Sequence, residues 1–205
     1  MDPMRMKAVP MHASSPPGWE KTRPPAILPG PDRVLGATLL VYYSRSGRTR
    51  SLAEQIASQC GADIEEIVDS VGRRGVFGYL RSLFEALLRI PAPIEPNRRS
   101  PRNYDTVIVG SPVWAGQVPS PVRSYLRRNR GRFRRVAFFC SHRGSGYRRT
   151  LHQLAMLSGR GAVATLALAE ADVAQRRHMR AVSRFSRVVK GGRQSLPAAR
   201  LRDAA

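Results

Sequence analysis

The sequence predicts a three-layer α/β sandwich built on a parallel sheet of five strands. Short apolar runs alternate with segments of helical periodicity from residue 37 to residue 189. Runs that are apolar almost throughout are typical of parallel strands buried on both faces, which helices must then cover. The chain has 205 residues, 42% of them hydrophobic, and this is enough for one ordinary domain with a full core.

Five apolar runs give the expected strands. The third run contains unbroken valines and an isoleucine, so we expect it to be buried on both faces. The strands are expected at 37–43 (ATLLVYY), 62–68 (ADIEEIV), 104–114 (YDTVIVGSPVW), 135–141 (RVAFFCS) and 162–168 (AVATLAL).

Helical periodicity fills the stretches between these runs. In the first helix one face is apolar, and in the second an apolar stripe ends at Pro91, which cannot continue a helix. Pro119 and Pro121 stand where the third helix begins, a position that proline favours. The helices are expected over 49–60, within 73–90, and over 120–129, 147–158 and 172–189.

The two ends of the chain differ from this pattern. Residues 1–34 are rich in proline and small residues, show neither periodicity, and are predicted to be disordered. Methionines at positions 1, 4, 6 and 11 leave open a later start of translation. The predicted domain covers residues 35–190, and residues 191–205 are expected to be a frayed tail.

The formal net charge of +21 is the most unusual feature of the composition. It indicates either a polyanionic partner or a base composition of the gene that favours arginine codons. The second interpretation is suggested by the fact that only three of the 35 basic residues are lysine. No basic motif interleaved with aromatic residues accompanies the charge, and there is no recognition-helix pattern. We therefore do not expect specific binding to nucleic acid.

No apolar run approaches the roughly 20 residues of a membrane-spanning helix, and no charged-then-apolar leader opens the chain. We therefore expect a soluble, cytoplasmic protein. Cys60 and Cys140 lie far apart and lack the spacing of metal ligands, so we expect reduced structural thiols and no metal site.

Three connections from a strand to a helix carry the residues suited to binding. Ligands of open parallel sheets bind beyond the carboxyl ends of the strands, where these connections lie. The first loop is SRSGRT (44–49), the second SPVWAGQVP (111–119) and the third SHRGSGYR (141–148).

The first loop offers hydroxyl groups, a permissive Gly47 and the free amides of a helix start, which together suit a doubly charged phosphate. The other interpretation is an ordinary helix cap, because Ser and Thr cap helices routinely. Neither GxxxxGK[ST] nor GxGxxG is present. In the second loop, Trp114 would either stack on a flat ring or pack beneath the following helix.

Three stretches together resemble the flavodoxin family. LLVYYSRSGRTRSLAEQIA is similar to its opening strand, phosphate loop and helix, YDTVIVGSPVWAGQVPSPVRSYL to its second flavin loop, and RRVAFFCSHRGSG to its third. GVFGYLRSLFEALLRIPAPI is similar to a segment of small bacterial and archaeal members. The resemblance runs in order over about residues 37–189.

The resemblance implies noncovalently bound FMN on a sheet ordered 2-1-3-4-5. The first loop would hold the phosphate. The second would lie against the isoalloxazine ring, with Trp114 stacked on it and a peptide near Gly116 facing flavin N5. The third would line the pyrimidine side of the ring. The residues carried over by position are Ser44, Arg45, Ser46, Gly47, Arg48, Thr49, Ser111, Pro112, Val113, Trp114, Ala115, Gly116, Ser141, His142, Arg143, Gly144, Ser145 and Gly146.

The chain departs from the family in its charge. Arg48 replaces a common asparagine and Ser46 a threonine, and typical members surround the flavin with acidic groups. Arg143 or His142 would stabilise the anionic reduced flavin, so we expect a less negative hydroquinone potential. The other interpretations are that Arg45 and Arg48 point into water, and that His142 is a surface loop residue.

These features predict an FMN-binding redox protein that carries electrons to an acidic partner protein. The first alternative is a reductase that takes hydride from NAD(P)H and reduces a quinone-type acceptor. The second is a flavin-free scaffold or a nucleic-acid-binding descendant of the fold.

Overall fold

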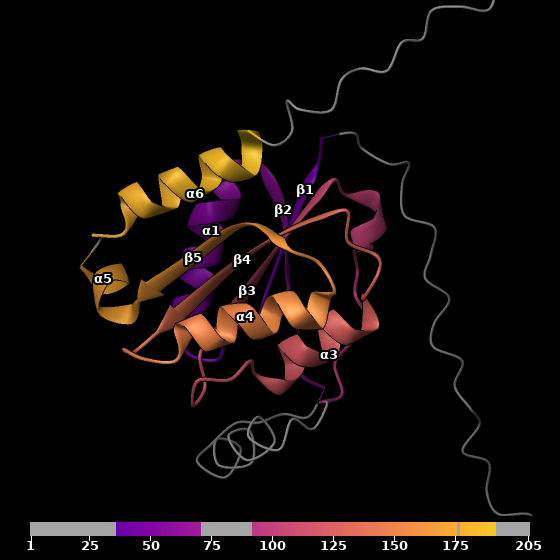
Figure 1. The fold of residues 1–205 in the computed structure, drawn as a ribbon, viewed down its shortest axis with the longest axis horizontal. Helices are drawn as coiled ribbons and strands as arrows, with labels where there is room; N and C mark the ends of the chain where they lie inside the picture. Colours follow the sequence, from indigo (N-terminus) through magenta and orange to yellow (C-terminus); the bar gives the residue numbers. More distant parts are fainter. Residues whose placement is uncertain (1–35, 71–91, 176, 192–205) are drawn as a thin grey trace, which may run out of the picture.

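The central element is a parallel sheet in the order β2-β1-β3-β4-β5, as predicted. The computed structural model describes residues 36–70, 92–175 and 177–191, and Figure 1 shows their arrangement. The strands are β1 (Thr38–Tyr42), β2 (Ala62–Glu66), β3 (Thr106–Pro112), β4 (Arg135–His142) and β5 (Ala162–Ala169).

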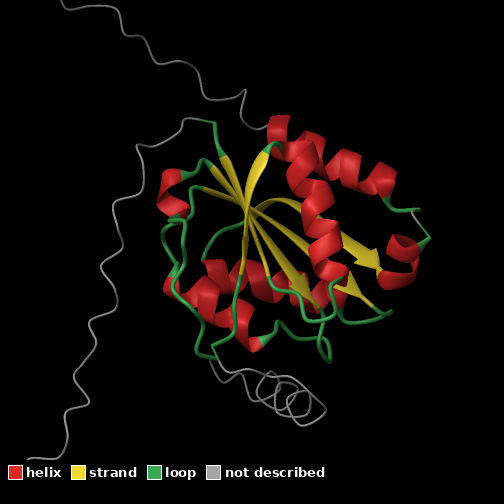
Figure 2. Ribbon diagram, turned by 180° about the vertical axis from the view of Figure 1, so that it is seen from behind, coloured by secondary structure: helices red, strands yellow, loops and turns green. Residues whose placement is uncertain are grey.

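Helices cover both faces of the sheet, which confirms the three-layer sandwich (Figures 1 and 2). One face carries α1 (Arg48–Cys60) and α6 (Met179–Gly191), and the opposite face carries α3 (Ser120–Arg128) and α4 (Tyr147–Ser158). The short helix α5 (Glu170–Ala174) follows β5, and the 3-10 helix η1 (Pro101–Asn103) precedes β3.

The sheet separates two apolar cores. Successive residues of a strand point to opposite faces, so Leu39 and Val41 enter the core under α3 and α4, whereas Leu40 enters the core under α1 and α6. All seven residues of β3 are buried, as its sequence predicted. The rigid sheet therefore fixes the positions of the loops at its carboxyl edge.

Among the described residues, the predicted elements agree with the structure to within two residues at each end, except at the last helix. That helix was predicted as one segment over 172–189, but it is divided into α5 and α6. His178 lies before α6 and is 3% exposed; its Nε2 is 2.7 Å from Gln55 Oε1 on α1, and its Nδ1 is 3.3 Å from the Asp172 carbonyl oxygen. These contacts fix the segment between α5 and α6 against α1 and α5. The local periodicity of the sequence does not indicate them.

Several predictions concern residues that the structure does not describe. The disordered extension (1–34) and the helix within 73–90 lie outside the described residues, as does the tail from residue 192 onward. Gly191, placed at the start of that tail, is instead the last residue of α6.

Both cysteines are buried free thiols, as predicted. Burial raises the pKa of Cys140 to about 12, so its sulfur stays protonated and unreactive. Within residues 36–70, 92–175 and 177–191, none of the helices has the length and apolar character needed to cross a bilayer.

Candidate functional site

The three loops with binding residues converge at one edge of the sheet. They leave β1, β3 and β4, which are adjacent and parallel, so their carboxyl ends lie side by side. Thr49 Oγ1 of the first loop is 2.9 Å from Ser141 Oγ of the third, and this hydrogen bond is buried. Val113 of the second loop donates its N–H to the Ser141 carbonyl at 3.0 Å. Ser141 therefore ties all three loops together.

The first loop ends in a helix start without a side-chain cap. Gly47 has φ 82° and ψ −15°, α1 begins at the next residue, and no acidic residue stands in its first turn. The Ser44 hydroxyl oxygen is buried and has no hydrogen-bond partner among the described residues. A buried hydroxyl without a partner costs about 1–3 kcal/mol, and an acceptor group bound at this loop would remove that cost. The helix-cap interpretation is wrong for Ser44, Ser46 and Thr49, because none of them caps α1.

The second loop is a tight turn with two left-handed residues. Trp114 and Gln117 exchange both backbone hydrogen bonds, at 2.8 and 3.2 Å, around Ala115 (φ 48°) and Gly116 (φ 69°). Two positive φ values in succession define a type I′ turn. Alanine in this conformation costs about 1–2 kcal/mol, and such strain gathers at functional sites.

Trp114 is half-buried. Its ring meets Tyr43 edge-on, with centroids 5.7 Å apart and planes at 76°, and it packs against the core under α3 and α4. The packing interpretation is therefore correct for part of the ring, and the exposed remainder is available for stacking.

Gln153 on α4 braces the second loop, and the sequence pattern did not indicate this role. Gln153 Oε1 accepts the Val118 N–H at 3.1 Å, and Gln153 Nε2 donates to Gln117 Oε1 at 2.5 Å. Gln117 is 5% exposed. A glutamine inside a helix gives no local signal of such a role, whereas the fold brings α4 beside the turn.

The third loop is organised around His142. This residue is 9% exposed, its ring stacks on Tyr147 at 4.5 Å, and its Nδ1 accepts the Gly144 N–H at 3.1 Å. The interpretation of His142 as a surface residue is therefore wrong. Gly146 has φ 82° and caps α4, and a Cβ added to it would lie 2.5 Å from Gly116 Cα. The second and third loops thus touch backbone to backbone.

We expect the protein to lose stability as the pH falls below about 6.5, in part through His142. Burial lowers the pKa of His142 below its ordinary value of 6.5, although Asp172 and Glu170 oppose this shift. The unfolded chain therefore takes up the proton first, so the contribution is present above that value and lost as the pH falls through the lower, folded pKa. Protonation of Nδ1 would also break the bond from Gly144.

Chemical unfolding of His142→Gln between pH 7.5 and 5 tests this, with the exposed His152→Gln as control. The His142 variant should show a weaker decline than wild type, and the His152 variant the same decline as wild type. Equal slopes for all three proteins would contradict the prediction.

The arginines of the first and third loops meet one acid. Arg48 Nε is 3.3 Å and Arg143 Nε 3.1 Å from Glu170 Oε2. The interpretation that Arg48 points only into water is therefore wrong; Arg45 is exposed at the same rim. Glu170 was missed because it follows β5, whose loop lacks the small and hydroxyl residues that directed attention to the other three.

The 18 predicted residues divide by exposure at this edge. Buried in strands or helix are Thr49, Ser111, Pro112, Ser141 and His142. Half-buried are Ser44, Gly47, Val113, Trp114, Gly116 and Gly146. Exposed are Arg45, Ser46, Arg48, Ala115, Arg143, Gly144 and Ser145. The structure brings all of them to one edge, although the Ser111 hydroxyl already donates to the Pro112 carbonyl at 2.8 Å.

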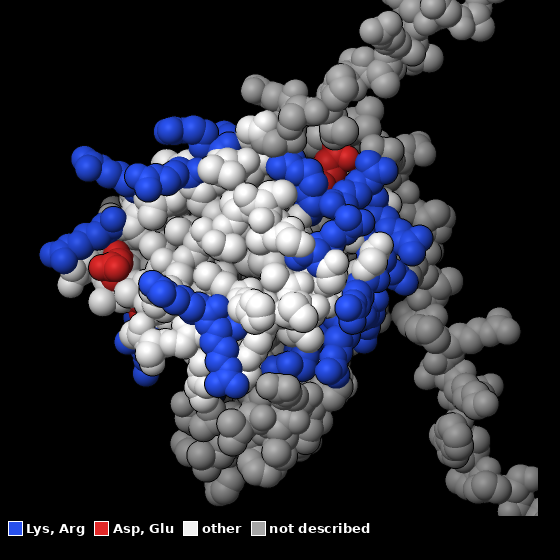
Figure 3. Space-filling model, in the orientation of Figure 1, with Lys and Arg blue, Asp and Glu red and all other residues white. Residues whose placement is uncertain are grey.

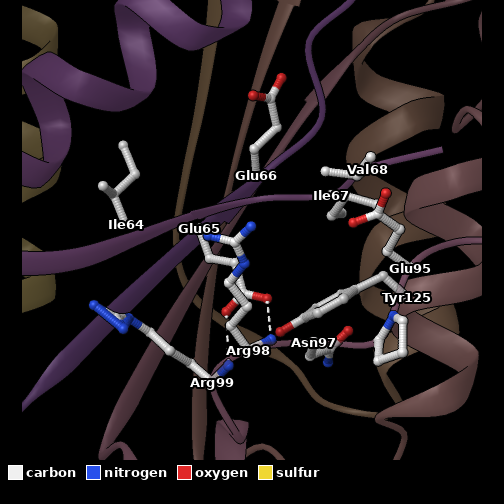
Figure 4. A pocket seen from close by; sticks show the side chains of 11 residues that line it. Ile64, Glu65, Glu66, Ile67, Val68, Glu95, Asn97, Arg98, Arg99 and Tyr125 are labelled. Atoms are coloured by element: carbon white, nitrogen blue, oxygen red, sulfur yellow. Dashed lines mark hydrogen bonds between the residues drawn. The ribbon is translucent and has the colours of Figure 1, made fainter. Parts of the chain in front are cut away.

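Metal-binding groups and a cavity are the other places where chemistry could occur. The described parts of the chain contain no group of three His, Cys, Asp or Glu residues that could hold a metal ion. A cavity of about 320 Å³ lies along β2 and the segment 95–99, and includes Tyr125, whose hydroxyl is buried without a partner among the described residues (Figure 4). Glu65 at its centre accepts N–H bonds from Arg98 and Arg99, at 2.9 and 3.0 Å. No residue of the three loops lines this cavity, and its charges have both signs.

Solved structures share this architecture. A flavoprotein from Lactobacillus acidophilus NCFM in complex with FMN is 24% identical, with a TM-score of 0.58 over 68% of this chain and 97% of that chain. The apo form of the flavoprotein from the same organism is 26% identical, with a TM-score of 0.52 over 64% of this chain and 91% of that chain. A candidate flavoprotein from Bacteroides eggerthii is 18% identical, with a TM-score of 0.56 over 72% of this chain and 98% of that chain.

These likenesses agree with the sheet order and the layers described above. The chain therefore has the flavodoxin-like fold. No family model matches the sequence, and no curated protein matches it.

Proposed function

We propose that this chain binds FMN noncovalently at the three loops and serves as an electron carrier. The observation that carries the proposal is the buried, unpartnered Ser44 hydroxyl beside the uncapped start of α1, at the edge where the second and third loops also end. A phosphate ester is the ligand that such a helix start favours. The flavoprotein of similar fold that was solved with FMN supports the choice of cofactor.

The first loop would hold the phosphate through neutral donors and one cation. The backbone N–H groups of the first turn of α1 and the hydroxyls of Ser44 and Ser46 supply the donors, and Arg48 supplies the charge at the rim. Thr49 has a different task, because its hydroxyl is bonded to Ser141 and holds the first loop against the third.

The second and third loops would hold the ring. Trp114 offers an exposed part of its indole, and Gln153 fixes the turn that carries Ala115 and Gly116. Contact between Gly116 and Gly146 sets how closely the two loops approach. Bound FMN would supply the electron transfer, and the residues of the chain bind it, orient it and exclude water from it.

An acidic protein is the expected partner of this carrier. Arg45, Arg48, Arg143, Arg148 and Arg149 are exposed on the first and third loops and the start of α4. Figure 3 shows many more Lys and Arg than Asp or Glu side chains on the visible face, although the basic side chains are densest on the right, away from the ends of β4 and β5. Opposite charge on the partner would accelerate encounter and orient the complex, and both effects decline as salt rises.

An NAD(P)H-dependent reductase is the second candidate, because the same arginines would attract an anionic dinucleotide. Anaerobic mixing of the yellow protein with NADPH separates the two. Rapid bleaching without a partner protein would establish the reductase, whereas slow bleaching favours the carrier.

Titration of apo-protein with FMN tests the proposal through quenching of flavin fluorescence. We expect saturable binding to the wild type, and binding at least about tenfold weaker in Ser44→Ala, since a hydrogen bond to a charged group contributes about 1.5–3 kcal/mol. Ser58→Ala is the matched control, because Ser58 is exposed near the other end of α1. Wild-type protein that folds but does not quench the flavin would reject the proposal.

A further inference from the structure

Glu170 joins two of the three loops through a single carboxylate oxygen. It is the first residue of α5, directly after β5, and its side chain is 16% exposed. Its Oε2 lies 3.3 Å from Arg48 Nε in the first loop and 3.1 Å from Arg143 Nε in the third. Glu170, which follows the edge strand β5, therefore contacts residues of the loops that follow β1 and β4.

Stability alone is a weak explanation for this arrangement. The side chains of Arg48 and Arg143 are 46% and 82% exposed, and exposed ion pairs contribute little to folding, typically below about 1 kcal/mol. The buried bond between Thr49 and Ser141 already joins the same two loops. The carboxylate instead changes two local properties, which are the direction of the guanidinium groups and the charge at the rim.

The charge effect has a definite sign. Two arginines that share one carboxylate present a net charge of about +1 to a ligand, whereas without it they would present +2. A carboxylate near an anion site weakens the binding of phosphate. It also weakens the binding of an anionic reduced flavin ring more than the binding of a neutral oxidised one. The positive charge of Arg143 that the sequence suggested for stabilising the reduced flavin is thus partly neutralised.

We propose that Glu170 is a positioning residue that aims Arg48 and Arg143 at the loop edge and limits the positive charge that the edge presents to a phosphate-bearing ligand. This inference rests on the proposed function for its flavin part. Its phosphate part requires only that the first loop binds an anion.

Glu170→Gln separates the charge from the geometry. Glutamine has nearly the same shape and keeps one oxygen that can accept from both arginines, so the negative charge is lost while an acceptor for both remains. Glu66→Gln is the matched control, because Glu66 also pairs with an arginine of α1, with Oε2 2.5 Å from Arg50 Nη2, but lies outside the three loops. Both variants change the net charge of the protein equally.

The first measurement needs no flavin. Thermal unfolding of apo-protein in sodium phosphate and in sodium chloride of equal ionic strength reports anion binding to the folded state. We expect Glu170→Gln to bind inorganic phosphate about fivefold more tightly than wild type, and Glu66→Gln to match wild type. Equal phosphate affinity in all three proteins, or weaker binding by Glu170→Gln, would overturn the inference, as would an equal gain in both variants.

The second measurement is the midpoint potential of the FMN-loaded protein. We expect Glu170→Gln to favour the reduced over the oxidised flavin by about fivefold, which corresponds to about 20 mV more positive for a two-electron couple. Arg143→Ala should shift the potential in the opposite direction, and by more when Glu170 is already glutamine. An unchanged potential in Glu170→Gln would contradict the inference, whereas a wild type that binds phosphate but no FMN would reject only the proposed function.

Discussion

Gly110→Ala should lower the free energy of unfolding by about 3 kcal/mol or prevent folding altogether. Gly110 lies inside β3, between Tyr42 of β1 and Phe139 of β4. A Cβ at this position would lie 2.1, 2.5 and 2.8 Å from three atoms of the Phe139 ring, which is fully buried. The ring has no free space to move into, and overpacking of this kind costs about 1–3 kcal/mol or more.

A second substitution tests the cause. The three atoms involved are Cζ, Cε1 and Cε2, and leucine has none of them. We expect Gly110→Ala combined with Phe139→Leu to be about 2 kcal/mol more stable than the sum of the single effects predicts, as measured by urea unfolding. Gly161→Ala is the control, because a Cβ there meets nothing within 4 Å. Additive effects in the double variant would show that the ring is not the cause.

This contact illustrates what the sequence contains and what it does not. The run VIVGS in 107–111 predicts a buried strand, because its side chains are small and apolar. The same run does not indicate that Gly110 gives space to an aromatic ring from a neighbouring strand. Such partners are set by strand order and register, which the local pattern does not determine.

The fold was predictable because it depends on patterns that repeat along the chain. Apolar runs of strand length, alternating with helical periodicity, were sufficient for the layers, and α4 matches its predicted range, 147–158. The division between α5 and α6 was not predictable, because His178 is held there by Gln55, a residue 123 positions away. Tertiary contacts decide such breaks after the local pattern has been satisfied.

The site was predictable to the extent that strand ends indicate it. Their small and hydroxyl residues single out the three loops as candidates. Because the strands before them are parallel and adjacent, the loops must meet at one edge of the sheet. Glu170 and Gln153 could not be inferred in this way. Each is a polar residue in a helix, and each acts on the loops only because the fold places α5 and α4 beside them.

Gly146→Ala should weaken FMN binding by at least about thirtyfold, equivalent to about 2 kcal/mol, while the protein still folds. Alanine at φ 82° is strained by about 1–2 kcal/mol. Its Cβ would also lie 2.5 Å from Gly116 Cα and 3.4 Å from Val113 Cγ1. The first of these neighbours is backbone, so the second and third loops must separate, and the positions of both walls of the proposed ring site would change.

Gly131→Ala is the matched control for this effect. Gly131 has a similar φ of 78°, and a Cβ there meets nothing within 4 Å, so alanine adds strain without a clash. It lies between α3 and β4, at the opposite edge of the sheet from the three loops. Both variants should lose thermal stability, and only Gly146→Ala should lose affinity for FMN in the fluorescence titration. An FMN affinity within twofold of wild type in Gly146→Ala would mean that the contact between Gly116 and Gly146 does not shape the binding site.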